Sequence, residues 1–307
     1  MPRRTTAILI AGILAALLGC QSGDKTPAGA KLTVAVTTIP QAWLVGLVGG
    51  EHVAVLTLVQ PGESHETYSP SDAQISRLMQ AKAYFRVGVA AEHGPWFKAI
   101  RDSGKLKIVD LRQNVPLLEM TEHDHHGHDE HHEAEESHEA DEEAFAGKDP
   151  HIWLSPRALK IQAQTVADTL AQLDPAHKAD YQRNLAALDG QLDQLDAQIR
   201  KMLAPMRGKA FFVYHPAWGY FAEAYGLRQI ALEQEGKEPS DQELTHLQQL
   251  AKKEDIKVIF VQPQIAGQSA QAVATAIHGR VQEIDPLDPN VPANLLHAAQ
   301  AIAGSGE

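Results

Sequence analysis

Three histidines and one aspartate stand where a ligand site is expected in the sequence. His65, His215 and Asp285 each follow a run of apolar residues typical of a β-strand, and His151 comes just before an expected helix. In open α/β sheets, ligands bind outside the carboxyl ends of the strands. A lone loop histidine is more often exposed or hydrogen-bonded to backbone, so the indication comes from the four residues taken together.

Imidazole and carboxylate groups in such places are typical of a metal site. Zn²⁺ accepts both kinds of ligand in a tetrahedron, at about 2.0–2.2 Å. Three neutral imidazoles suit zinc better than manganese, which prefers more oxygen ligands. Copper and nickel also bind imidazole well, so ligand type alone does not define the metal bound in the cell. We therefore expect Zn²⁺ as the ligand, with Mn²⁺ or iron as the alternative.

Residues 1–20 have the pattern of a lipoprotein signal peptide. Two arginines precede an apolar stretch that is too short to span a membrane and that ends in Leu-Leu-Gly-Cys at Cys20, the only cysteine. This ending resembles the lipobox of bacterial lipoproteins, in which the cysteine is lipidated; an ordinary signal peptide is the alternative. Lipidation of Cys20 would leave no free thiol, so a metal site would use His, Asp and Glu. Residues 21–30 are expected to form a flexible tether.

A segment rich in histidine and acid carries nearly all of the net charge. Residues 122–143 contain seven histidines among many carboxylates, and residues 121–149 account for −11 of the formal net charge of −12. The rest of the chain has no basic excess to suit nucleic acid. We expect a loop over residues 121–148 that is disordered when empty and gathers zinc weakly. A dispensable acidic insertion is the alternative.

The remaining sequence predicts an α/β fold in two similar halves. Each half has four β-branched or aromatic runs separated by helical segments, which favours a mainly parallel four-stranded sheet covered on both faces. The expected strands are Lys31–Thr37, His52–Val59, Tyr84–Val89 and Leu106–Leu111, then Phe211–Tyr214, Arg228–Leu232, Val258–Val261 and Val281–Ile284.

Three helices carry particularly clear signals. Ser71–Ala81 opens on a start signal, and Ser240–Glu254 opens with a capping box formed by Ser240 and Glu243. Pro175–Leu203 has apolar residues at steps of three and four, which predicts one long amphipathic helix. Such a helix can bridge two lobes and hold their separation nearly fixed. The expected domains are therefore a lobe at 31–173, a linking helix at 174–205 and a lobe at 206–307.

Several motifs resemble one known family. LVQPGESHETYSPSD, DPHIWLSP, YHPAWGYFAEAYGL, EGKEPSDQEL and KVIFVQPQ with IDPLDPN follow one another in that order. They are similar to the metal-binding subunits of zinc and manganese ABC transporters, the ZnuA/TroA-like (cluster A-I) family, from about residue 31 to the C-terminus. The resemblance implies two (β/α) lobes joined by one long rigid helix, with a metal between the lobes.

The resemblance also implies a ligand set. His65, His151 and His215 correspond to the family's metal ligands, and Asp285 to the carboxylate that completes the site in many members. Manganese-binding members usually have a carboxylate at the place of His215. Some zinc-binding relatives use water or a nearby glutamate as the fourth ligand, so Glu63 and Glu66 remain alternatives to Asp285, as ligands or as supporting groups.

The function implied by the resemblance is capture of extracytoplasmic Zn²⁺ and delivery to an ABC permease with its ATPase. We expect a monomer that is periplasmic or on the cell surface, lipid-anchored to a bacterial membrane, and not an enzyme. A zinc hydrolase is disfavoured because the chain has no His-Glu-x-x-His motif. A metal-dependent surface adhesin remains an alternative.

Overall fold

The computed structural model describes residues 31–120, 147–233, 239–264 and 268–306. Cys20, the tether at 21–30 and nearly all of the expected loop at 121–148 lie outside the described residues. Within the described ranges, no helix has both the length and the apolar character needed to cross a lipid bilayer.

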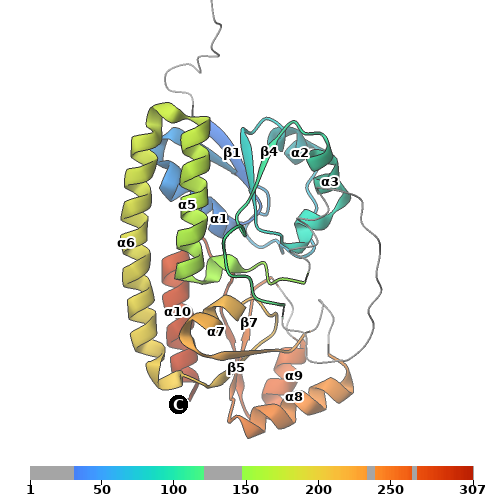
Figure 1. Ribbon diagram of the computed structural model, residues 1–307. Coiled ribbons are helices and arrows are strands. Elements are labelled where there is room, and N and C mark those ends of the chain that lie inside the picture. The colour runs from blue at the N-terminus through green and yellow to red at the C-terminus, as the bar shows by residue number, and fades with distance from the viewer. Residues whose placement is uncertain (1–30, 121–146, 234–238, 265–267, 307) are drawn as a thin grey trace, which may run out of the picture. The chain divides into compact units, whose positions relative to one another are not determined.

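Two four-stranded parallel sheets form the centres of the two lobes (Figure 1). The strand order is β2-β1-β3-β4 in the first sheet and β6-β5-β7-β8 in the second, so the two lobes repeat one topology. The strands of the first are β1 (Leu32–Val36), β2 (Val53–Thr57), β3 (Ala83–Arg86) and β4 (Lys107–Asp110). Those of the second are β5 (Ala210–Val213), β6 (Arg228–Ala231), β7 (Val258–Val261) and β8 (Arg280–Glu283).

Helices connect the parallel strands, as crossover connections require. The α-helices are α1 (Ile39–Gly49), α2 (Asp72–Leu78), α3 (Pro95–Asp102), α5 (Pro156–Leu173), α6 (Lys178–Leu203), α7 (Gly219–Tyr225), α8 (Asp241–Lys253), α9 (Gln268–Ala276) and α10 (Val291–Ala303). Local sequence explains several of their starts. Ser71 and Ser240 each accept the first-turn backbone N–H of the residue three positions later, which completes the capping boxes at α2 and α8.

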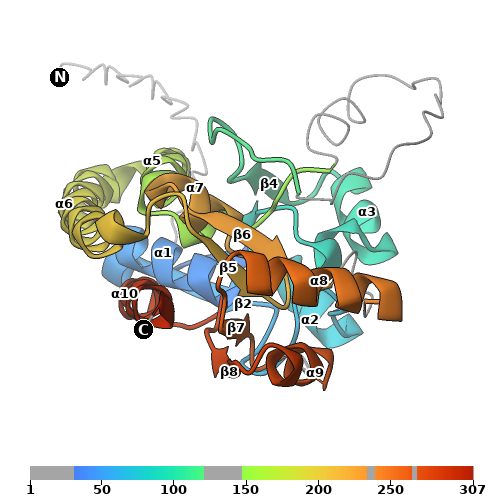
Figure 2. The same cartoon turned by 90° about the horizontal axis from the view of Figure 1, so that it is seen from below.

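The long helix α6 joins the two lobes. Its seven buried residues are Tyr181, Leu185, Leu188, Leu192, Leu195, Ile199 and Leu203. This apolar stripe packs against α5 and α1 of the first lobe and α10 of the second. Figures 1 and 2 show α5 and α6 side by side along one flank of the two sheets. One expected detail is different, because Pro175–His177 forms a separate 3₁₀ turn before α6 begins at Lys178.

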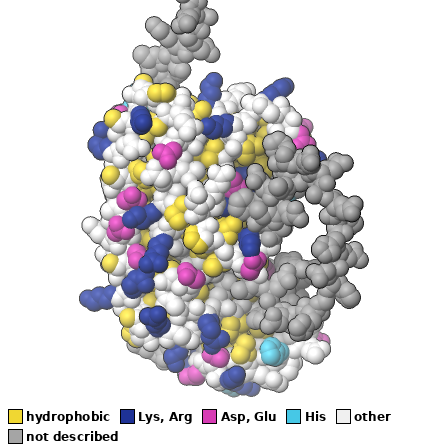
Figure 3. All heavy atoms as spheres, in the orientation of Figure 1, with side chains coloured by type: hydrophobic (Ala, Val, Ile, Leu, Met, Phe, Trp, Pro, Cys, Tyr) yellow, Lys and Arg dark blue, Asp and Glu magenta, His cyan; other side chains and the backbone are white. Residues whose placement is uncertain are grey.

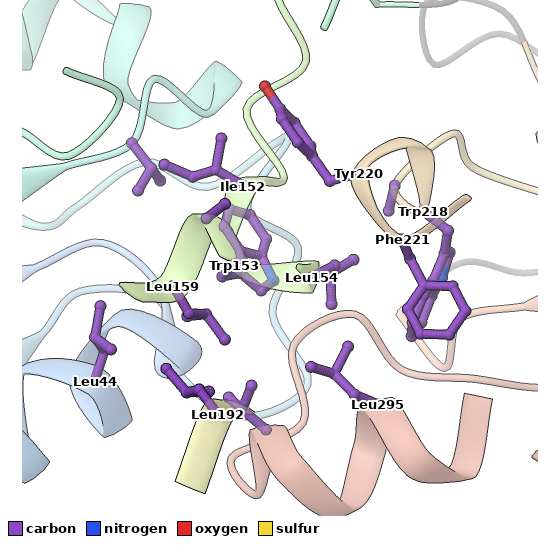
Figure 4. Packing of buried hydrophobic residues seen from close by; sticks show 14 of the residues in the cluster. Leu44, Ile152, Trp153, Leu154, Leu159, Leu192, Trp218, Tyr220, Phe221 and Leu295 are labelled. Carbon is purple, nitrogen blue, oxygen red and sulfur yellow. The ribbon is translucent and has the colours of Figure 1, made fainter. Parts of the chain in front are cut away.

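The largest apolar core is shared by both lobes. A single cluster of buried side chains includes Leu44 of α1, Leu192 of α6 and Leu295 of α10. Figure 4 shows these helices meeting around Trp153, with Phe221 of the second lobe nearby. Two smaller clusters cover the opposite faces of the sheets, one in each lobe. The predicted fold class, two parallel sheets joined by a long helix, is therefore confirmed.

Candidate metal centre

The loops at the carboxyl ends of the strands bring three histidines together. His65 lies in the loop after β2, and His215 comes two residues after the end of β5. His151 immediately precedes a 3₁₀ turn, Ile152–Leu154, that leads into α5. All three side chains are buried, and Glu66, next to His65, joins them in one group of closely spaced potential metal ligands.

The facing atoms of this group have the spacing of a small coordination shell. Nε2 of His151 lies 3.0 Å from Nε2 of His65 and 3.3 Å from Nε2 of His215. Oε1 of Glu66 lies 2.9 Å from Nε2 of His65 and 3.7 Å from Nε2 of His215. Zinc ligands at about 2.0–2.2 Å from the metal have neighbours roughly 3.3–3.5 Å apart at the corners of a tetrahedron. The four atoms all lie within 4.8 Å of one another, which is close enough for them to share one Zn²⁺.

Two buried carboxylates hold the opposite ring nitrogens of two of the three imidazoles, those of His151 and His215. Nδ1 of His151 lies 2.7 Å from Oδ1 of Asp149, which also accepts the backbone N–H of His151 at 2.9 Å. Nδ1 of His215 is hydrogen-bonded to Glu233. Metal-binding histidines commonly donate their other ring N–H to a carboxylate, which fixes the tautomer and the orientation of the ring. The protonated Nδ1 leaves the lone pair of Nε2 directed at the centre of the group.

The electrostatics of His151 favour its metal-binding form. Burial, together with the charges of His215 and His65, holds the pKa of His151 well below its usual value. The imidazole is therefore neutral at neutral pH, as a metal ligand must be. Burial raises the pKa of Asp149 to about 7, although the hydrogen bond from the backbone N–H of His151 acts to lower this pKa. A cation at the centre would favour the charged form of Asp149.

The pKa of Glu66 is lowered, whereas the pKa of His215 is raised. Burial works against ionisation of Glu66, but the hydrogen bond with His65 and the charges of the three histidines outweigh it and lower its pKa to about 2. Burial also lowers the pKa of His215, yet the bond to Glu233 and the charges of Glu66 and Glu233 raise it overall. The group therefore offers a charged carboxylate together with one imidazole that holds a proton more firmly than free histidine does.

Trp153 forms one wall of the centre. Its ring meets those of His151 and His65 edge-on, with centroids 5.2 Å and 5.9 Å apart. Its Nε1–H donates to the carbonyl of Pro286, in the second lobe, at 2.7 Å. The side chain is fully buried, so Trp153 belongs both to the core and to the surroundings of the centre.

Asp285 lies outside the group, contrary to expectation. It follows β8, which is two strands away from β5 in the second sheet. Neighbouring strands are about 4.8 Å apart, so the ends of β5 and β8 are separated by roughly 10 Å across the sheet. Oδ1 of Asp285 instead accepts the backbone N–H of Leu287 at 2.8 Å and Nε2 of Gln264 at 3.0 Å. Glu66, an alternative on the sequence, lies within the group, and the carboxylate of Glu63 accepts the backbone N–H of Gln60.

Asp149 and Glu233 were not among the residues predicted to belong to the site. Asp149 stands two residues before His151, in the same motif, which is a signal that could have been used. Glu233 follows β6 as His215 follows β5, and these two strands are paired. Residues that follow paired parallel strands reach the same edge of the sheet, so this contact was accessible only once the strand order was known.

Comparison with known proteins identifies the family of the chain. A family model described as "ZnuA: Zinc-uptake complex component A periplasmic" matches residues 34–300. The chain belongs to this family. High-affinity zinc uptake system protein ZnuA of Yersinia pestis is 27% identical over 269 residues, which cover 83% of each chain. Zinc-binding lipoprotein AdcA of Streptococcus pneumoniae (strain R6) is 28% identical over 288 residues, 92% of this chain and 55% of AdcA.

Solved ZnuA structures share the fold. One crystal structure of ZnuA superposes with a TM-score of 0.78 at 34% identity and covers 91% of this chain and 100% of that one. A deletion mutant of ZnuA with zinc bound gives the same TM-score and identity. The family is a component of a zinc-uptake complex, which assigns this chain to zinc uptake and gives Zn²⁺ as its ligand, and the His and Glu group is a candidate for its binding site.

Proposed function

We propose that the protein captures one extracytoplasmic Zn²⁺ with His65, His151, His215 and Glu66 and delivers it to an ABC permease driven by its ATPase. The convergence of three Nε2 atoms and one carboxylate oxygen within 4.8 Å of one another carries this proposal. Zinc is bound as cargo, so the site must give it up again at the permease.

Binding without catalysis is the role that the ligand set supports. Catalytic zinc sites keep three protein ligands and an open position for water or substrate. In the proposed site Glu66 takes the fourth corner, and the buried carboxylates Asp149 and Glu233 are hydrogen-bonded to imidazole nitrogens. No member of this set is left to act as a general base on a bound water.

We further propose that the protein is a monomer anchored by a lipid at Cys20. The lipobox-like ending of the first twenty residues and the relative named as a lipoprotein support the anchor.

The mixed charge of the surface agrees with a partner other than nucleic acid. Figure 3 shows basic and acidic side chains mixed over the face formed by α5 and α6, where Lys160 pairs with Asp193 and Arg200 with Asp196.

A calorimetric zinc titration of His151→Ala tests the site. Wild-type protein, stripped of metal with chelator, is expected to bind one Zn²⁺ tightly. His151→Ala is expected to lose this binding event, because a central ligand with two near neighbours is gone. His297→Ala serves as the control, since His297 is exposed and outside the group. Retention of full-affinity 1:1 binding by His151→Ala would show that the ligand assignment is wrong.

A further inference from the structure

Two chain segments of the first lobe pair next to the metal centre. Backbone N–H groups of Met120 and Asp149 donate to the carbonyls of Gly147 (2.8 Å) and Leu118 (2.9 Å). The carboxylate of Asp149 then holds both the backbone and the ring of His151. Asp149 therefore takes part in this backbone pairing and also holds His151, a proposed metal ligand.

A tyrosine of the second lobe closes this pairing. The hydroxyl of Tyr220, at the start of α7, accepts the backbone N–H of Leu118 at 3.1 Å and donates to the carbonyl of Asp149 at 3.1 Å. The residue is 4% exposed, so both bonds are made away from solvent. In Figure 4 the oxygen of Tyr220 points away from α7 toward the chain of the first lobe.

The same short segment of the second lobe carries His215. The backbone N–H of Ala217 donates to the carbonyl of His215 at 2.8 Å, and that of Trp218 donates to the side chain of Gln229, on β6, at 2.6 Å. Gly219 lies directly against Asp149, because a Cβ there would come within 2.5 Å of Oδ2. This short segment thus carries the proposed ligand His215 and, five residues later, the hydroxyl of Tyr220. That hydroxyl is hydrogen-bonded to Asp149, which holds the ring of His151.

We propose that Tyr220 is a positioning residue for zinc: its hydroxyl fixes the backbone of Asp149 and thereby sets the separation of His151 and His215 across the lobe boundary. The inference rests on the proposed function. Ligand constellations work when they are held to within about 0.5 Å of the required geometry. Loss of the hydroxyl leaves two buried backbone groups without their partner, and the pairing that carries Asp149 is then free to shift.

Tyr220→Phe tests this role because it removes the hydroxyl and keeps the ring. We expect zinc affinity, measured by competition with a chelator, to fall about 10–100-fold, as for other groups that orient metal ligands. Co²⁺ bound in place of Zn²⁺ is expected to give an altered visible absorption spectrum, because its ligand geometry changes. Tyr225→Phe is the matched control, since Tyr225 is on the same helix but packs against Phe221 and Arg200.

The readouts separate positioning from general stability. A purely structural hydroxyl would lower the unfolding temperature of the metal-free protein and leave zinc affinity and the Co²⁺ spectrum of the folded protein unchanged; that result would overturn the proposal. In an Asp149→Asn background, Tyr220→Phe is expected to cost less affinity than in the wild type, because the two act in one chain of contacts. If the losses of zinc affinity from Tyr220→Phe and Asp149→Asn were strictly additive, Tyr220 would not act through Asp149.

Failure of the proposed function gives a different result. If wild-type protein bound no Zn²⁺ tightly, or if His151→Ala bound it normally, the ligand assignment itself would be wrong. If the wild type binds zinc through His151 and Tyr220→Phe matches it in affinity and in Co²⁺ spectrum, only the positioning role is overturned.

Discussion

At the scale of single residues, the centre combines fixed imidazoles with a carboxylate from the neighbouring position in the chain. Asp149 and Glu233 fix the tautomers of His151 and His215, and Trp153 limits the rotation of two rings. The least constrained member is Glu66, whose side chain is 29% exposed. The identity of the fourth ligand is therefore the point most open to a direct mutational test.

Glu66→Gln and Asp285→Asn distinguish the two candidates for the fourth ligand. We expect Glu66→Gln to weaken zinc binding on the order of 10–100-fold or more, because it removes the only charged ligand of the group. Asp285→Asn keeps an oxygen that can accept from Leu287 and is expected to bind zinc almost normally. Chelator competition measures both. A larger loss of zinc affinity in Asp285→Asn would identify Asp285 as the fourth ligand. Normal zinc binding by both variants would indicate that water is the fourth ligand.

Zinc affinity is expected to decrease as the pH falls. A protonated imidazole cannot bind metal, and the pKa of His215 is raised, so competition by protons begins above the usual histidine range of about 6.5. His151 has a lowered pKa and stays neutral to lower pH. Binding measured at about pH 7.5 and about pH 5.5 tests the sign. Equal affinity at the two values would argue against a three-imidazole site.

At the scale of secondary-structure elements, the segments that flank the histidine-rich stretch are already adjacent. Met120 and Gly147 are joined by a 2.8 Å backbone hydrogen bond. Deletion of residues 122–143 leaves Thr121 and Ala144–Ala146 to connect them, which is a length common in hairpin loops. We therefore expect the deletion variant to keep its fold and its tight zinc site and to lose only additional, weaker zinc binding.

Zinc stoichiometry and affinity of the full-length and shortened proteins, with circular dichroism of both, check this prediction. The wild-type Co²⁺ spectrum in the shortened protein would add that the ligand geometry is intact. Loss of the tightest binding event with unchanged circular dichroism would mean that the principal site lies within residues 122–143.

Sequence patterns predicted most elements because each pattern has a local physical cause. The β-branched runs correspond to strands within a few residues, and the apolar stripe from Tyr181 to Leu203 is buried as periodicity predicts. Helix α10 was not among the predicted elements, although its buried residues Leu295, Ala298 and Ile302 follow helical spacing and it packs against α6.

The site was predictable only in part. His65 and His215 follow predicted strands and His151 precedes a predicted helix, and the structure brings the three together. Asp285 is outside the group of closely spaced side chains, since β8 lies on the far side of β7 from β5, and its role as a ligand stays a prediction. The contact of Glu233 with His215 likewise depends on the pairing of β5 with β6, which no local pattern encodes.

At the scale of the whole molecule, the shared core makes the two lobes one cooperative unit. Leu192 of α6 and Leu295 of α10 belong to the same buried cluster as Leu44 of α1. We expect one unfolding transition in scanning calorimetry, in spite of the two separate sheets. Zinc at about 1,000 times its dissociation constant is expected to stabilise the folded state by about 4 kcal/mol and to move this single transition upward. Two resolved transitions, with only one moved by zinc, would contradict this prediction.

The position of α10 limits how this protein can be divided or recombined. The helix ends the second lobe in sequence, yet its buried residues Leu295, Ala298 and Ile302 belong to the cluster that runs through α6 into the first lobe. A gene fragment that encoded residues 206–307 alone would present this apolar surface to water and invite aggregation. The second lobe is thus not expected to fold independently of the rest of the chain. A chimaera that exchanges this lobe between relatives must also include the residues of α6 that pack against α10.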